Sequence, residues 1–398
     1  MNMTLDREVI ARFGAAASML VLSSALACGQ ILAGPISNEL DEGLWRVDVV
    51  TRDRVRVCDQ GSSALAVDDS GGRVFFAQGA QLSRWDYGGA LNSAVALGSI
   101  VGPNGAELAI IGLAYGGGRM FASASSAPWL FEISLSNLVA TPVATSSQLS
   151  SVEGLSFDAS SGLFYAANSV PSGPGLAVEL YSIDLLGSGA MSFVAAIPVD
   201  SDSVCVGNGV AYAMSKSGGR IITFDLTTNA YADELLAPWS DGVFACGSEF
   251  APSLTPPAGP RVFCHPTAPQ FCQPVLTSVG APSASLASGF DLLHKNLYSG
   301  SSIRGVYSLT GRSGAPFQGG LRCIAGPIFR LPPVLGPTSS PWCANDHAID
   351  FNAVIASGAN AGLVAGQTVW YQAVIKPNNF VTPFALQFTS GVEFTILP

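Results

Sequence analysis

VEGLSFDASSGLFYAANS, residues 152–169, is the stretch that decides the fold, because it contains two strand-like runs around one tight turn. Both runs are rich in apolar, aromatic and β-branched residues, whereas the intervening ASSG has the small and polar residues of a turn. The stretch therefore predicts a β-hairpin. Three other places in the chain carry a weaker version of it.

Aligning these copies places a turn glycine three residues before a strand aromatic in each unit. The glycines are Gly72, Gly118, Gly162 and Gly209, and the aromatics are Phe75, Phe121, Tyr165 and Tyr212. The first strands align at Leu65, Leu113, Leu155, Val204 and Val243, with spacings of 48, 42, 49 and 39 residues. Repeats of about 45 residues with several strands each are typical of a β-propeller.

A third strand follows in each unit and has a further copy upstream. The third strands are LSRWD from Leu82, LFEIS from Leu130, LYSID from Leu180 and IITFD from Ile221. LWRVD, residues 44–48, precedes the first complete unit, whereas the last unit has a candidate second strand at RVFC and no third. An N-terminal strand pair that completes the last blade would leave no exposed sheet edge. We predict a five-bladed propeller over residues 40–260; six blades, an open β-sandwich or unrelated hairpins are the alternatives.

These units resemble the broad class of propeller repeats written GLAFDxxxGxLYxxD and LYxIDxxTG. The matching pieces are GLSFDASSGLFYAAN, LYSID and FDLTTN, and the resemblance covers residues 43 to about 250. It implies a fold and no particular activity, because propellers host binding proteins and enzymes alike.

The 45-residue repeat ends at the proline-rich segment APSLTPPAGP, residues 251–260, which predicts a domain boundary. In the tail, residues 261–398, QTVWYQAVI and FALQFTSGVEFTIL are strand runs rich in β-branched and aromatic residues. They predict a small β-sandwich. For its four cysteines, the simplest of three connectivities joins neighbours in the sequence, Cys264 with Cys272 and Cys323 with Cys343.

The tail also resembles a C-terminal module found on large exported proteins of certain environmental bacteria, whose purpose is not established. The matching pieces include TGRSGAPFQGGLRC, PIFRLPPV, IDFNA and the closing LQFTSGVEFTILP. The resemblance implies a disulfide-bearing β-sandwich. Such modules often carry an Arg-containing stretch after the late tryptophan, where this chain has VWYQAVIKPNNF, so any role of that stretch does not carry over.

The first 27 residues have the features of a signal peptide. Arg7 and Arg12 precede an apolar run over residues 15–27, which ends in small residues at Ala25 and Ala27. A buried helix or membrane anchor is the less favoured alternative, because the run is shorter than the ~20 residues that span a bilayer. A lipoprotein anchored at Cys28 is a second alternative. We therefore expect a secreted or cell-surface protein with no membrane span after cleavage.

The eight cysteines favour structural disulfides in an oxidising compartment, because no CxxC pair with metal-ligand spacing occurs. Cys205 and Cys246 are predicted to pair across the innermost strands of neighbouring blades, since the period-two rule puts both on one face. Cys58 is then left for Cys28 if the leader is cleaved after Ala27, and is a free thiol if the leader is cleaved later.

The composition agrees with many short strands joined by turns. Only 12% of the 398 residues are charged, whereas glycines and prolines number 44 and 25. The formal net charge is −10 and the chain has just three lysines, so we find no basic stripe that would neutralise phosphates. We expect an all-β protein that does not bind nucleic acid.

Motifs of known chemistry are missing from the sequence, which has no nucleophile elbow, Walker loop, zincin motif or dinucleotide fingerprint. All three histidines lie in the tail, and His347 is close to Asp346 and Asp350. A polar loop beside a disulfide accounts for this trio better than a metal or acid–base cluster. We therefore predict no catalytic residue and no organic cofactor.

One column of the repeat suggests a metal site. Two residues before the first-strand positions stand Ser63, Ile111, Glu153, Asp202 and Asp241. Three consecutive blades thus place a carboxylate where the innermost strands enter the central channel. The hypothesis is that Glu153, Asp202 and Asp241 hold calcium or a cationic ligand, and the alternative is three solvated loop ends. The aspartates that close the third strands are instead predicted to stabilise turns: Asp48, Asp86, Asp184 and Asp225.

The leader, the repeat and the lack of catalytic motifs predict an exported, non-enzymatic binding or cell-surface protein. The propeller would be a scaffold for a ligand or an extracellular macromolecule, and the tail would serve surface association or assembly. One alternative is a metal-assisted hydrolase, lactonase or lyase at the channel mouth. A purely structural envelope component is the other.

Overall fold

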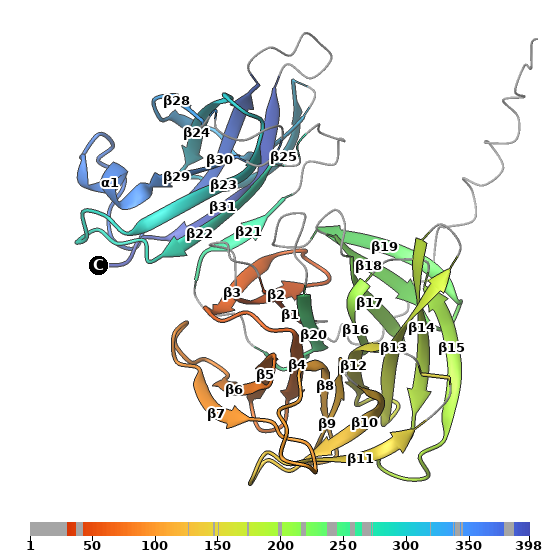
Figure 1. Ribbon diagram of the computed structural model, residues 1–398. Coiled ribbons are helices and arrows are strands. Elements are labelled where there is room, and N and C mark those ends of the chain that lie inside the picture. The colour runs from red at the N-terminus through yellow and green to blue at the C-terminus, as the bar shows by residue number, and fades with distance from the viewer. Residues whose placement is uncertain are drawn as a thin grey trace, which may run out of the picture.

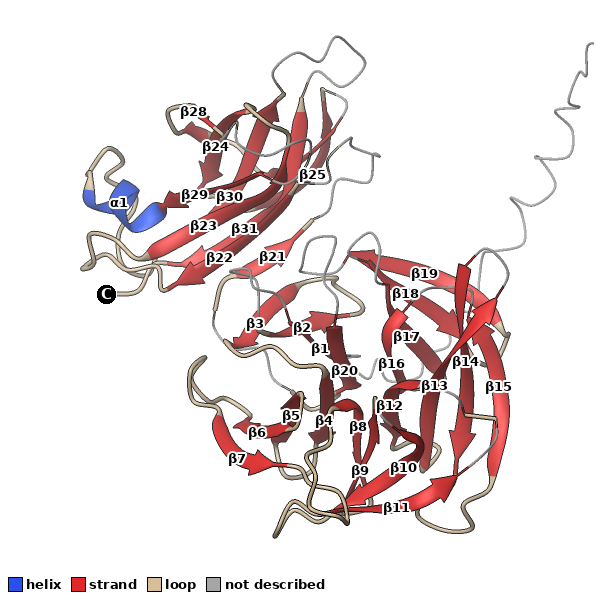
Figure 2. Cartoon of the chain, viewed as in Figure 1, coloured by secondary structure: helices blue, strands red, loops and turns tan. Residues whose placement is uncertain are grey.

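The computed structural model of the chain is almost entirely β, with a ring of small sheets and a second group of strands towards the C-terminus (Figures 1 and 2). This confirms the predicted fold class, an all-β propeller followed by a small β-sandwich. Within its described residues the structure has 31 strands and one short helix. The residues described are 30–36, 43–125, 127–145, 148–149, 151–172, 175–197, 201–215, 220–236, 245–254, 259–264, 272, 274–318, 320–336, 338, 343, 345–377 and 386–398.

Four antiparallel sheets of four strands make up most of the propeller, and in each the strands pair in chain order. The first comprises β4 (Ala64–Asp68), β5 (Arg73–Gln78), β6 (Gln81–Asp86) and β7 (Val95–Ser99), and the second β8 (Ile110–Gly116), β9 (Arg119–Ala124), β10 (Ala127–Ile133) and β11 (Ala140–Thr145). The third comprises β12 (Val152–Asp158), β13 (Leu163–Ser172), β14 (Gly175–Ile183) and β15 (Met191–Ile197), and the fourth β16 (Ser201–Gly207), β17 (Val210–Ser215), β18 (Arg220–Asp225) and β19 (Ala230–Leu236). The opening hairpin of the sequence is thus β12 and β13.

A fifth four-stranded unit closes the ring and joins distant parts of the chain. Its innermost strand is β20 (Ala245–Phe250), followed outwards by β1 (Gln30–Ile36), β2 (Leu44–Asp48) and β3 (Arg54–Cys58). Closure by N-terminal strands is confirmed, but the N-terminal segment supplies three strands instead of two. The expected propeller start at residue 40 omits β1, because QILAGPI directly follows the apolar leader and lacks the repeat pattern. The candidate second strand at residues 261–264 is not the second strand of this unit, because β21 (Arg261–Phe263) pairs with the outer strand β3.

Small residues allow the innermost strands to approach one another closely. A Cβ atom on Gly154 would lie 2.9 Å from a backbone nitrogen of β16, and one on Gly247 would lie 2.8 Å from a backbone nitrogen of β4. Gly247 therefore occupies in β20 the position of Gly154 in β12. This equivalence makes Ser248, and not Val243, the first-strand position of the fifth unit. The sequence alignment favoured Val243 because GVFAC is more apolar than ACGSEF, which is the strand in the structure.

Turn glycines and strand-end aspartates behave as the repeat predicts. The φ angles of Gly72, Gly118, Gly162 and Gly209 are 62°, 78°, 73° and 77°, in the region that favours glycine. The carboxylate of Asp48 accepts hydrogen bonds from the backbone N–H groups of Val50 and Thr51 at 2.9 and 2.8 Å. Asp184 and Asp225 accept from backbone N–H groups in their own turns in the same way. The predicted role in turn stabilisation is therefore confirmed for these three aspartates, whereas the carboxylate of the fourth, Asp86, accepts a hydrogen bond from the side chain of Arg84.

The C-terminal domain packs two sheets around one apolar core. One sheet has the order β21 (Arg261–Phe263), β31 (Gln387–Thr395), β30 (Thr368–Lys376) and β24 (Ser302–Ser308), and β24 also pairs with β27 (Phe329–Arg330) and β28 (Val334–Leu335). The other sheet has β22 (Val275–Gly280), β23 (Phe290–Leu297) and β29 (Asn345–Asp350), followed by α1 (Phe351–Ala356). A hairpin of β25 (Arg312–Phe317) and β26 (Gly320–Ile324) lies beside the first sheet. Aromatic residues such as Phe290, Phe351, Tyr371 and Phe394 fill the core between the sheets.

Two disulfides cross-link this domain, and both span long stretches of sequence. Cys264 is bonded to Cys323 and Cys272 to Cys343, at sequence separations of 59 and 71 residues. The pairing of sequence neighbours expected from local closure is therefore wrong. Strand order gives the reason: β21, which ends beside Cys264, pairs with β31, and β26, which carries Cys323, also packs against β31. The predicted bond between Cys205 and Cys246 stays a prediction, since the side chain of Cys246 is outside the described residues.

The two domains share one continuous ten-stranded sheet. β21 pairs with β3 of the propeller on one side and with β31 of the C-terminal domain on the other, so it lies between them (Figure 1). Arg312 reinforces this junction, because its guanidinium donates two 3.0 Å hydrogen bonds to Asp53 of the propeller and one of 2.7 Å to Glu393 of β31. The same guanidinium lies 4.4 Å from the ring centroid of Phe263.

Candidate functional site

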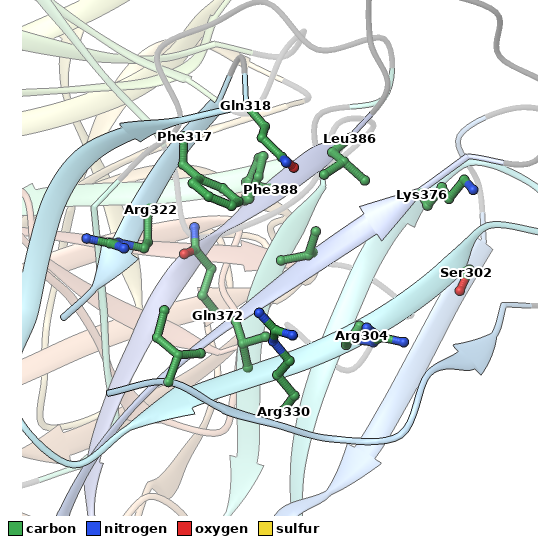
Figure 3. Close-up of a pocket in the computed structure, with 13 residues that line it drawn as sticks. Ser302, Arg304, Phe317, Gln318, Arg322, Arg330, Gln372, Lys376, Leu386 and Phe388 are labelled. Carbon is green, nitrogen blue, oxygen red and sulfur yellow. The ribbon is translucent and has the colours of Figure 1, made fainter. Parts of the chain in front are cut away.

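A groove with a volume of about 520 Å³ lies on the C-terminal domain (Figure 3). Its polar or charged lining residues are Ser302, Arg304, Gln318, Arg322, Arg330, Gln372 and Lys376, and its apolar ones are Val306, Phe317, Ile328, Val374, Leu386 and Phe388. Among the described residues that line it, four are cations and none is a carboxylate. We call this feature the basic groove.

The groove follows from the two-residue period of the strands. On β24, Ile303 and Tyr307 point into the core, while Ser302, Arg304 and Val306 alternate with them and line the groove. Val306 and Phe388 are buried and form part of an apolar floor. The cations stand around this floor, so the groove combines a low-polarity base with a charged rim.

The four cations come from four strands, β24, β26, β27 and β30. Figure 3 shows Arg330 and Arg304 projecting between Arg322 at one end and Lys376 at the other. Across the part of the chain that the structure describes, none of these four side chains forms an ion pair. Other arginines do form such pairs, as in the 2.6 Å contact of Arg119 with Glu132.

Charge is divided unequally between the two domains. The tail, residues 261–398, contains seven Lys or Arg and four Asp or Glu, whereas residues 1–260 contain eleven Lys or Arg and 24 Asp or Glu. Four of the seven tail cations line the basic groove. A fifth, Arg312, is held by Asp53 and Glu393. The groove is therefore a local concentration of positive charge on an acidic protein.

One wall of the basic groove is the β25–β26 hairpin, which is fixed in place by covalent and polar contacts. Cys323 on this hairpin carries the disulfide to Cys264. Its backbone N–H donates to Oε1 of Gln372 at 3.0 Å, and Nε2 of Gln372 donates to the Leu321 carbonyl at 2.9 Å. At the end of the hairpin, Phe317 lies edge-on to Phe388, with ring centroids 6.0 Å apart. The wall is thus held against the sheet before any ligand arrives.

This arrangement suits binding of an anion. Arginine presents planar guanidinium donors that match carboxylate, phosphate or sulfate oxygens in a two-pronged geometry. An apolar floor lowers the local dielectric and so strengthens these contacts. Because the cations are spread along the groove, a ligand with several anionic groups would engage more of them than a single small anion.

The propeller axis holds a buried carboxyl group. Glu249 on β20 is 2% exposed, and its side chain accepts a 2.5 Å hydrogen bond from Ser156 and a 3.3 Å bond from the backbone N–H of Phe157. Both partners belong to β12, which is not a neighbour of β20 in the ring. Burial raises the pKa of Glu249 to about 8, so the group is protonated at neutral pH. It links two blades across the axis as a neutral side chain.

The proposed calcium ligands follow a column of β-bulges. Strand register shifts by one residue at Glu153, at Asp202 and at Ile111 of the preceding blade. Glu153 is partly exposed there, and the side chain of Asp202 is outside the described residues, as is all of Asp241. The register of β20 puts Cys246, not Asp241, at this position of the fifth unit. A cation site formed by Glu153, Asp202 and Asp241 stays a prediction.

The two carboxylates near His347 make contacts within the domain, and Oδ2 of Asp346 lies 4.0 Å from Nζ of Lys295. Asp350 is the N-cap of α1, where it accepts from the backbone N–H groups of Asn352 and Ala353.

His294 is the buried imidazole of the domain. Its Nδ1 donates to the His347 carbonyl at 3.1 Å, so Nε2 accepts from the Tyr371 hydroxyl at 2.9 Å. Among the described residues no group of three or more His, Cys, Asp or Glu side chains is arranged to hold a metal.

Reasoning from the sequence missed the basic groove. Successive cations of the groove are separated by 8 to 46 residues along the chain, so they form no continuous basic segment in the sequence. The available signal was the contrast in charge between the acidic first part and the slightly basic tail.

Within the described residues, no helix is long and apolar enough to cross a membrane.

Comparison with protein-family models finds no match, and comparison with curated proteins finds none either. Among solved structures, a nidogen/laminin complex matches at 13% identity, 54% of this chain, 78% of that chain and a TM-score of 0.36. A candidate 6-phosphogluconolactonase from Bacteroides uniformis matches at 11% identity, 56% and 99% coverage and a TM-score of 0.33. The β-propeller domain of Cps50 (Swd1) from Myceliophteria thermophila matches at 10% identity, 59% and 89% coverage and a TM-score of 0.34. At these TM-scores, none of the three indicates a function for this chain.

Proposed function

We propose that this protein is an exported binding protein that captures an anionic partner in the basic groove, with the propeller as its scaffold. The observation that carries this proposal is the convergence of four cations on one apolar floor, with no carboxylate partner among the described residues: Arg304, Arg322, Arg330 and Lys376. Cations that only kept the domain soluble would be dispersed over the surface and paired with acids. A groove lined by one sign of charge raises the local concentration of an oppositely charged ligand.

Export is supported by the cysteine chemistry and by the position of β1. Two disulfides hold the C-terminal domain, and such bonds persist in oxidising compartments. β1 begins at Gln30, just after the small residues of the leader. Cleavage after Ala27 would leave this strand intact, whereas cleavage after Ala33 would remove buried residues of the fifth unit.

A binding experiment with three polyanions tests the proposed function. Polygalacturonate, poly-L-glutamate and phosphatidylglycerol vesicles are titrated with the mature protein at low and high salt. We expect binding to at least one, weakened at high salt because the contacts are ionic. A double variant, Arg304→Ala with Arg330→Ala, should lose about tenfold or more in affinity, since each arginine supplies charge-assisted hydrogen bonds.

The matched control removes two arginines from the propeller surface, Arg84→Ala with Arg119→Ala. Both side chains are partly exposed and paired with acids, so the control has the same change in net charge without touching the groove. The control should bind like the wild type. Absence of binding to all three polyanions, or equal losses in both double variants, would show that the basic groove is not the binding site.

A further inference from the structure

We infer that the ligand of the basic groove is an acidic polysaccharide, with its carboxylates on the cations and a sugar ring against Phe317. This inference rests on the proposed function and adds the chemical class of the partner. Three features of the groove point to it: the spacing of the cations, an exposed aromatic wall and a sheet edge that is already occupied.

The spacing of the cations favours a polymer with repeated charges. On the pleated surface Ser302 pairs with Lys376 and Val306 pairs with Arg330, and Arg304 lies between these two pairs on β24. Lys376, Arg304 and Arg330 therefore form a diagonal row across three adjacent strands. Diagonal neighbours in antiparallel sheets are about 7–8 Å apart. A single phosphate or carboxylate engages only part of such a row, whereas a chain of charged units can engage all of it.

Phe317 provides a surface for an uncharged part of the ligand. It is 42% exposed, and within the described chain it is the only groove residue among the exposed large apolar side chains. Its edge-on contact with Phe388 and the disulfide of its hairpin restrict its orientation. An aromatic face that is held in place can stack on the apolar face of a sugar ring, and the adjacent Gln318 lies nearby for a hydroxyl group.

An extended acidic peptide fits less well, because peptides commonly bind by adding a strand to a free sheet edge. The outer edge of β24 is already paired, with β28 through Ser302 and Ile303 and with β27 through Val306 and Tyr307. A membrane surface fits less well too, since insertion needs several protruding apolar side chains, and among the described residues of the groove only Phe317 is a large apolar side chain that is exposed.

The experiment compares the three polyanions at equal charge concentration by isothermal titration calorimetry, using the disulfide-intact full mature protein. Polygalacturonate should bind at least about tenfold more tightly than poly-L-glutamate or phosphatidylglycerol vesicles. Phe317→Ala should weaken polygalacturonate binding about tenfold and leave the weaker ligands unchanged, because only the sugar ring uses the aromatic face. Phe193→Ala, at a propeller residue that is 56% exposed, is the matched control and should have no effect.

The outcomes separate this inference from the proposed function. Tighter binding of poly-L-glutamate or of vesicles, with sensitivity to Arg304→Ala and Arg330→Ala, would retain the anion-binding function and overturn the polysaccharide. Unchanged polygalacturonate affinity in Phe317→Ala would overturn it as well. If the wild-type protein binds none of the three polyanions, both the polysaccharide inference and the proposed function would be overturned.

Discussion

The propeller and the C-terminal domain are both β structures, yet their strands come together in opposite ways. Four sheets of the propeller are meanders in which each strand pairs with the next one in the chain. In the C-terminal domain β21 pairs with β31, β24 with β30 and β23 with β29, so several of its strand pairs join distant segments. The disulfides occur where contacts are long-range, which is where a cross-link most restricts the unfolded chain.

The two domains also bury titratable groups of opposite character. In the propeller Glu249 is buried as a neutral acid, and in the C-terminal domain His294 is buried as a neutral base. Each group is hydrogen-bonded across two elements that are not sequence neighbours. We therefore expect the stabilities of the two domains to respond to pH in opposite directions.

The largest expected effect is the loss of β1. A chain that begins at Ser37 lacks the strand between β20 and β2, which exposes two sheet edges and removes the buried Ile31 and Leu32. We expect no cooperative unfolding transition of the propeller in thermal melts followed by circular dichroism. A chain that begins at Cys28 keeps β1 and serves as the control. An unchanged melting temperature for the shorter chain would disprove closure by the N-terminal strands.

The second effect is confined to the C-terminal domain. Replacing Cys264 and Cys323 by serine opens a loop with a sequence separation of 59 residues and should destabilise this domain by about 4 kcal/mol on the chain-entropy model. Chemical unfolding with separate fluorescence and circular dichroism probes should show little change in the propeller. Cys58→Ala, at a buried propeller cysteine, is the control. Equal destabilisation of both domains would show that the shared sheet makes them one cooperative unit.

The same contrast explains how far the fold could be predicted from the sequence. In the propeller a repeated glycine and aromatic pair identifies each hairpin, because the interactions that form it are local. The fifth unit was misaligned since Ser248 and Glu249 are polar residues in a buried strand, where apolar ones are expected. The disulfides of the tail were mispaired because proximity along the chain says little about partners in a sandwich with long-range pairing.

The third prediction concerns the propeller and pH. In the unfolded chain the carboxyl of Glu249 ionises near pH 4.5, whereas burial raises its pKa in the folded state to about 8. The folded state thus holds one more proton between these values, and stability should fall as pH rises through this window, by at most about 1.4 kcal/mol per pH unit.

Glu249→Gln keeps the shape of the side chain and removes the titration. Its propeller stability should be nearly flat over the same window, as measured by urea unfolding at several pH values. Asp184→Asn is a control, because its carboxylate is exposed in a turn. A variant with the same pH slope as the wild type would exclude Glu249 as the source.

The fourth prediction concerns the C-terminal domain and has the opposite sign. Burial lowers the pKa of His294 from 6.5 to about 4, so the unfolded state takes up a proton before the folded state does. Stability of this domain should fall as pH decreases from 6.5 towards 4, with the same upper limit per pH unit. His294→Gln should reduce this slope. A slope that persists in the variant would assign the acid sensitivity to another group.

The candidate groove could not be predicted because its cations are far apart in the sequence. Arg304, Arg322, Arg330 and Lys376 become neighbours only when β24, β26, β27 and β30 pack together. In contrast, the sequence suggested a metal site at the channel carboxylates because these residues recur at the repeat period. Periodicity shows which positions are equivalent in the fold, and at Glu153 and Asp202 that shared feature is a β-bulge.

The smallest expected effect lies at the junction, where the comparison can be sharpened most. Arg312 bridges Asp53 of the propeller and Glu393 of the C-terminal domain, with side chains that are 36%, 11% and 23% exposed. Because solvent screens part of this attraction, a double-mutant cycle of Asp53→Asn with Arg312→Gln should give a coupling energy of about 1 kcal/mol, weaker at high salt. The more exposed pair of Arg84 and Asp86, within one blade, should give a coupling near zero. If the two couplings are equal, the bridge contributes no more than an ordinary surface pair, and β21 alone joins the domains.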